Sequence, residues 1–67
     1  MSEQEAYGMP KRKLIDGHYY YYNNPANNKQ DAKNWVKNLK YKGLMARVVH
    51  QTFHGYDKYH VYWRGSE

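Results

Sequence analysis

Apolar residues recur with a helical period in one part of the chain, residues 29 to 42. Four of them fall at i, i+3, i+4 and i+7 and would share one helix face: Ala32, Trp35, Val36 and Leu39. Asn28 can cap the first turn, and Gly43 is a typical left-handed stop after the last. The pattern predicts one amphipathic helix with Trp35 in the core.

Three other stretches are rich in aromatic and β-branched residues, which is typical of β-strands. The first, residues 18 to 22, holds four consecutive tyrosines and ends before Pro25, which cannot donate to a strand ladder. Residues 44 to 53 and 57 to 64 flank a turn around Gly55 and predict a hairpin.

The order strand, helix, strand, strand predicts an α+β fold, a three-stranded sheet with one helix packed on one face. A right-handed crossover would make the first two strands parallel, and the third would run antiparallel to both if it lay between them. Residues 14–65 would form this single βαββ domain, and residues 1–13 a flexible tail ending in a basic cluster.

The chain has 67 residues and no cysteine, so its core is small and no disulfide supports it. These features suit a cytoplasmic protein. No apolar run approaches the length of a membrane span, so we expect no membrane partner.

Charge changes the picture more than size does. The net charge is +5, but three of the six acids are at the ends of the chain. Residues 8 to 66 hold eleven Lys and Arg against three Asp, a balance of +8. A basic domain favours polyanionic partners such as nucleic acid, although charge also serves solubility.

One helix covers only one face of a sheet, so the other face should be open. Alternation in the last strand sends His60, Tyr62 and Arg64 to that face, and Arg47 joins them from the preceding strand. The tyrosine run cannot be phased by its own pattern. We include Tyr20 and Tyr22 among the candidate residues.

Rings interleaved with arginines are suited to single-stranded or structured nucleic acid, since bases stack on the rings while cations contact phosphates. The alternative is a homodimer that uses the rings as an apolar seam. The helix offers a second basic surface, for phosphates or simply for solvent, made of four lysines: Lys29, Lys33, Lys37 and Lys40.

Catalytic chemistry finds little support, and we expect neither an enzyme nor a cofactor. The only serines, Ser2 and Ser66, are near the chain ends, and no closely spaced carboxylate pair occurs. In a strand, His50 and His54 would lie about 13 Å apart, too far to share a metal.

The segment AKNWVKNLKYKGLMARVV, residues 32 to 49, resembles the helix-to-strand passage of SPOR-type domains. The resemblance extends over roughly residues 19 to 64. It implies a ferredoxin-like βαββ architecture. SPOR-type domains bind peptidoglycan glycan strands on the open sheet face, so the resemblance also implies a glycan-binding module, but the second helix of such domains has no counterpart in this sequence.

Overall fold

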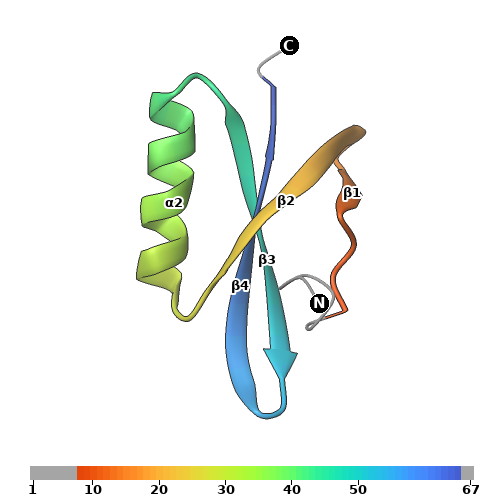
Figure 1. The fold of residues 1–67 in the computed structure, drawn as a ribbon, viewed down its shortest axis with the longest axis vertical. Helices are drawn as coiled ribbons and strands as arrows, with labels where there is room; N and C mark the ends of the chain where they lie inside the picture. The colour runs from red at the N-terminus through yellow and green to blue at the C-terminus, as the bar shows by residue number, and fades with distance from the viewer. Residues whose placement is uncertain (1–7, 66–67) are drawn as a thin grey trace.

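A computed structural model describes residues 8–65 of the chain. Most of the predicted tail, and Ser2 and Ser66, lie outside the described residues. The elements are β1 (Arg12–Ile15), β2 (His18–Ala26), α2 (Lys29–Tyr41), β3 (Met45–Phe53) and β4 (Tyr56–Arg64) (Figure 1). The described helix is neither long nor apolar enough to span a membrane.

The predicted α+β class with a single helix on a sheet is confirmed for the described residues. The sheet is fully antiparallel, with strand order β1-β2-β4-β3, so β4 lies between β2 and β3. The prediction of three strands is wrong, because β1 precedes β2 and pairs with it from Arg12↔Tyr21 to Ile15↔His18.

The sequence contains a turn signal for this extra hairpin. Asp16 and Gly17 both have positive φ, 51° and 81°, as a type I′ turn requires, and Asp-Gly is a preferred pair for it. Residues 12 and 13 therefore belong to the sheet and not to a flexible tail. The basic cluster concealed the start of this strand.

The helix begins and ends almost where predicted. The Asp31 amide donates to the Asn28 side chain at 2.8 Å, which caps the first turn. At the other end Gly43 has φ 84°, and the Leu44 amide donates to the Leu39 carbonyl at 3.0 Å, forming a Schellman stop.

The core lies between α2 and the three strands that it contacts, β2, β3 and β4. Five buried residues form it: Ala26, Ala32, Leu39, Ala46 and Val61. Four partly buried residues pack against this core: Val36, Leu44, Tyr59 and Trp63. Trp35 is 42% exposed, so its predicted place in the core is wrong. The buried face follows Ala32 and Leu39, two turns apart, which places Trp35 on the flank.

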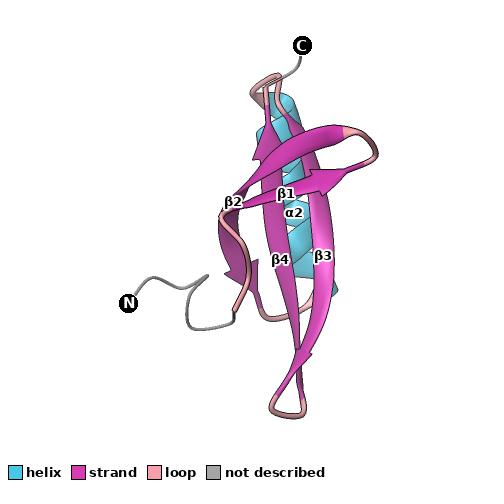
Figure 2. Cartoon of the chain, turned by 90° about the vertical axis from the view of Figure 1, so that its right-hand side faces the viewer, coloured by secondary structure: helices cyan, strands magenta, loops and turns pink. Residues whose placement is uncertain are grey.

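The sheet curls strongly, and this decides what its other face can do. The β1–β2 hairpin crosses over the face opposite α2 (Figure 2). An ion pair of 3.2 Å between Asp16 in the hairpin turn and Arg47 on β3 joins the two edges of the curl. The expected open face is therefore enclosed along much of its length.

Candidate functional site

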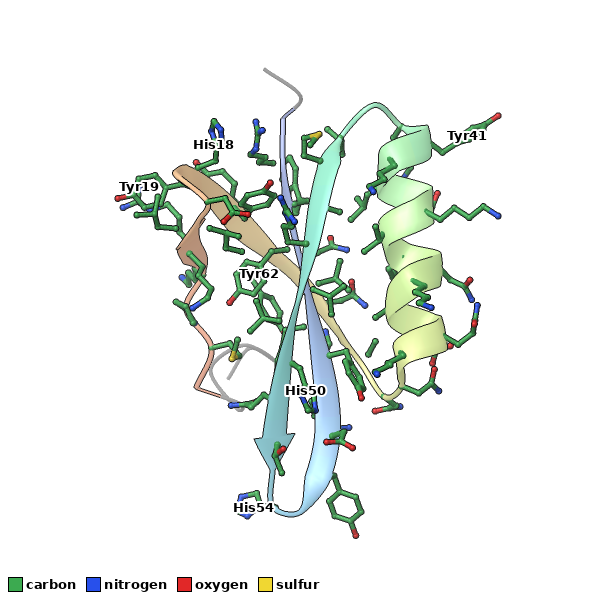
Figure 3. The ribbon with its side chains drawn as sticks, turned by 180° about the vertical axis from the view of Figure 1, so that it is seen from behind. His18, Tyr19, Tyr41, His50, His54 and Tyr62 are labelled. Atoms are coloured by element: carbon green, nitrogen blue, oxygen red, sulfur yellow. The ribbon has the colours of Figure 1, made fainter. Side chains whose placement is uncertain are left out.

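The enclosed face holds a cluster of four rings, which we call the inner aromatic cluster: Tyr20, Tyr22, His60 and Tyr62. Tyr20, His60 and Tyr62 are almost completely buried, and Tyr22 is half-buried. Tyr62 lies in the middle of the curl (Figure 3), where its hydroxyl donates to the Pro10 carbonyl at 2.8 Å. His60 and Tyr62 face away from the helix as predicted, and Tyr20 and Tyr22, whose facing was left open, share that face, but three of the four present no ring to a ligand.

Hydrogen bonds and ring contacts hold the inner aromatic cluster together. The His60 Nε2 proton is donated to Gln51 Oε1 at 2.8 Å, which leaves Nδ1 to accept from the Tyr22 hydroxyl at 3.0 Å. Tyr22 meets Tyr62 edge to face, with ring centres 5.4 Å apart. This is the geometry of a polar core, and we assign the cluster a structural role.

Electrostatics at the cluster follow from burial and from two arginines. Burial raises the pKa of Tyr62 and lowers the pKa of His60, since both charged forms lose solvent. Hydrogen bonds from Arg47 and Arg64 lower the pKa of Tyr20. The two predicted arginines thus lie at the rim of the inner aromatic cluster and interact with Tyr20.

The other two tyrosines of the run lie on the outside of the curl. Tyr19 is 52% and Tyr21 48% exposed, and Tyr21 contacts Trp63 with ring centres 5.8 Å apart. The Arg12 guanidinium carbon lies 4.4 Å from the centre of the Tyr19 ring. We call Arg12, Leu14, Tyr19 and Tyr21 the outer aromatic patch.

The sequence did not identify this patch. Period-two alternation puts Tyr19 and Tyr21 on the same face of the strand but does not tell which face that is. Arg12 was assigned to the tail, and Leu14 was assigned to no site. The Asp16-Gly17 turn would have placed Leu14 opposite Tyr19 and Arg12 opposite Tyr21, as observed. Recognising that turn is therefore the signal that could have found the patch.

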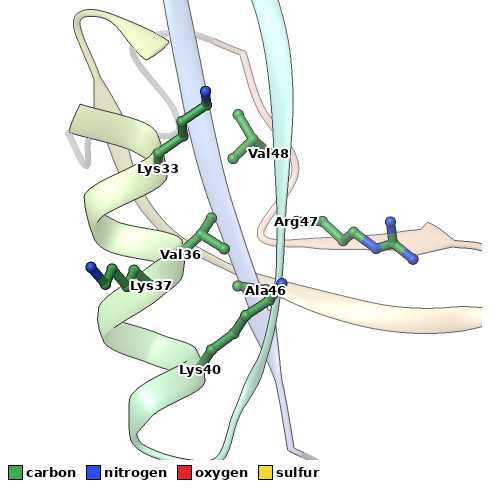
Figure 4. Close-up of a pocket in the computed structure, with 7 residues that line it drawn as sticks. All are labelled: Lys33, Val36, Lys37, Lys40, Ala46, Arg47 and Val48. Carbon is green, nitrogen blue, oxygen red and sulfur yellow. The ribbon is translucent and has the colours of Figure 1, made fainter. Parts of the chain in front are cut away.

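The predicted lysines of α2 divide into two groups. Lys33, Lys37 and Lys40 line a groove between α2 and β3, whose floor includes Val36 and Val48 (Figure 4). Lys29 is exposed at the start of the helix and does not line the groove. Lys33, Lys37 and Lys40 form a lysine row on α2, whereas the outer aromatic patch lies on β1 and β2. The two are therefore separate candidate surfaces.

No cluster of three or more His, Asp or Glu able to hold a metal occurs among the described residues. His50 is instead held by Asp57, with Nε2 and Oδ1 2.8 Å apart, and stacks on Tyr59. His54 lies in the β3–β4 turn with φ 51° (Figure 3). His50 and His54, which are four residues apart in the sequence, thus have different surroundings.

No protein-family model, curated protein or solved structure matches this chain. The resemblance to SPOR-type domains stays a prediction.

Proposed function

We propose that this domain binds single-stranded nucleic acid without catalysis, with bases stacking on the outer aromatic patch. The observation that carries the proposal is the placement of Arg12 over the ring of Tyr19, beside a second half-exposed ring, Tyr21. Bases of any sequence can stack on such rings, while a guanidinium contacts the phosphate. The ligand surface is thus the outside of the curl.

The charge of the domain supports an anionic ligand. Residues 8 to 66 carry eleven Lys and Arg against three Asp, and one of these, Asp16, is paired with Arg47. Release of counterions would supply much of the affinity, and stacking would favour single strands over duplex. We expect low sequence specificity, because the rings of the patch can stack on any base and the cations contact phosphates, which are the same in every nucleotide.

A fluorescently labelled ten-nucleotide thymidine strand tests the proposal by anisotropy at several salt concentrations. We expect Tyr19→Ala and Tyr21→Ala each to weaken binding by about 1–3 kcal/mol and to leave the salt slope unchanged, since a ring releases no counterion. Arg12→Ala should lower the slope by about one unit.

Tyr41 is the matched control, because it is 92% exposed and lies at the end of α2, away from the patch. Tyr41→Ala should bind like the parent. Equal affinities for the parent, Tyr19→Ala and Tyr21→Ala would refute this surface as the nucleic-acid site.

The same patch favours one second candidate, a homodimer. Leu14 is 58% exposed beside Tyr19 and Tyr21, and a contiguous apolar surface of this kind can form a dimer seam. Sedimentation velocity over a concentration series distinguishes the two candidates. A dimer that Leu14→Lys disrupts, together with no affinity for the thymidine strand, would favour the homodimer.

A further inference from the structure

The groove between α2 and β3 is a second surface with its own chemistry. Its volume is about 500 Å³, and Val36, Ala46 and Val48 supply its apolar lining. Lys33 and Lys40 extend from α2 toward β3, whereas the side chains of Lys37 and Arg47 point away from the groove (Figure 4). The groove therefore combines an apolar floor with a cationic rim.

One wall of the groove is the edge of the sheet. Within the described residues, β3 pairs only with β4, so the outer side of this nine-residue strand has no strand beside it. Edge strands of this length accept an extended segment as an added strand, through main-chain hydrogen bonds. The helix runs alongside β3 (Figure 1), so its lysines would lie beside an added strand.

Charge identifies the kind of segment that fits. The groove lining contains no acidic residue. The three acids among the described residues lie elsewhere: Asp16 pairs with Arg47, Asp57 pairs with His50, and Asp31 is in the first helical turn. No carboxylate of the described residues therefore balances the groove lysines, and an acidic ligand would complement them. A second copy joined edge to edge would bring two lysine rows together, which disfavours self-pairing.

The spacing of the lysines also suits a strand. Along the helix, Lys33 and Lys40 are separated by about 10.5 Å. Side chains on one face of a strand recur every ~6.7 Å, so two carboxylates that flank an apolar residue lie about 13 Å apart, and the long lysine side chains can reach both while that residue covers Val48. The backbone of a nucleic acid has no regularly repeating N–H and C=O groups to pair with β3, which makes a peptide the better match.

We infer that the groove between α2 and β3 binds an acidic, extended segment of a partner protein, which adds to β3 as a further strand. Its helix-facing residues alternate between carboxylates, held by Lys33 and Lys40, and an apolar side chain over Val36 and Val48.

The probe is a fluorescein-labelled, end-blocked peptide, Ser-Glu-Thr-Val-Thr-Glu-Ser, in which two glutamates flank a valine on one strand face. Anisotropy with the full chain should show saturable binding. Lys33→Glu should weaken it about tenfold or more, since an attraction becomes a repulsion. Lys29→Glu makes the same charge change outside the groove and should weaken it less than threefold. Thermal melting checks that both variants fold.

Two N-methylated versions of the peptide test the main-chain pairing. One is methylated at the odd-numbered residues and the other at the even-numbered residues, so each keeps the charge but lacks the N–H donors on one side of the strand. One version should lose affinity about tenfold or more, because only one set of amides faces β3. Tyr19→Ala should bind the unmodified peptide like the parent, so this test stands apart from that of the proposed function.

Four results would overturn the inference. They are the absence of saturable binding up to millimolar peptide, equal losses in Lys29→Glu and Lys33→Glu, full affinity of both N-methylated peptides, and displacement of the peptide by the thymidine strand in Tyr19→Ala as in the parent. The last would make the groove a phosphate site.

Discussion

His60 shows at the level of one residue how the curl of the sheet changes chemistry. The imidazole is completely buried, and its two nitrogens bond to Gln51 and Tyr22 in the neutral form. Burial lowers its pKa, and the nearby charge of Lys58 lowers it further. In the neutral form, the Tyr22 hydroxyl donates its proton to His60 Nδ1. Protonation of Nδ1 would place a second proton between these two atoms and break this hydrogen bond.

We therefore expect acid to destabilise the domain through His60. An unfolded histidine has a pKa of about 6.5, so below that pH the unfolded chain binds more protons and the free energy of unfolding decreases, down to the lowered pKa of the folded state. Urea denaturation at pH 7.5, 6.5 and 5.5 measures the loss. The variant His60→Phe should be less stable at pH 7.5 but less sensitive to acid.

An NMR titration of the His60 imidazole checks the cause directly. A folded-state pKa at or above 6.5 would contradict the argument.

At the level of elements, the helix face is the clearest difference between pattern and structure. Trp35 is the largest residue of the predicted apolar set, yet it lies beside Asp31, Asn34 and Asn38 on the flank of α2. Leu39 is 8% exposed and lies in the core. Side-chain size therefore did not indicate which residue faces the sheet.

Substitutions on the helix should reflect this geometry. We expect Trp35→Ala to lower the free energy of unfolding by about 1 kcal/mol, and Leu39→Ala to lower it by about 2–5 kcal/mol, because only the latter leaves a cavity in the core. Urea denaturation compares the two variants. A larger loss in Trp35→Ala would place the buried face on the other side of the helix.

Tyrosines on the inside of the curl and tyrosines on its outside should contribute differently to stability. We expect Tyr20→Ala and Tyr62→Ala to cost about 3–5 kcal/mol, as for other buried large aromatics, and Tyr19→Ala to cost about 0.5 kcal/mol. Circular dichroism with thermal melting distinguishes them. If Tyr19→Ala also unfolded the domain, the outer aromatic patch would be part of the core.

The sequence predicted those features that local chemistry determines. Asn28 and Gly43 set the helix ends because capping depends on neighbouring backbone groups. The alternation in the last strand, which sent His60, Tyr62 and Arg64 away from the helix, agrees with the place of Val61 in the core. The curl could not be predicted, because it depends on pairing β1 with β2 across a turn that was not recognised. For that reason Tyr20, His60 and Tyr62 were expected on an open face.

For the whole molecule, the small core limits stability. Few residues are fully buried, several of them are alanines, and there is no disulfide. Chains below about 70–80 residues rarely obtain more than 3–5 kcal/mol from a single core. We expect urea denaturation at pH 7.5 to give a free energy of unfolding of about 3–5 kcal/mol. A value above about 8 kcal/mol would require a stabilising contribution not described here, such as association.

The central position of β4 has a consequence for the time at which the chain can fold. β4 is the last strand to be synthesised, yet both β2 and β3 pair with it. Before it emerges from the ribosome, only the β1–β2 hairpin and a 13-residue helix can form, and either is marginal alone. Folding of this domain is therefore completed only once Arg64 has emerged from the ribosome, and until then the pairing edges of β2 and β3 are open to chaperones and to aggregation.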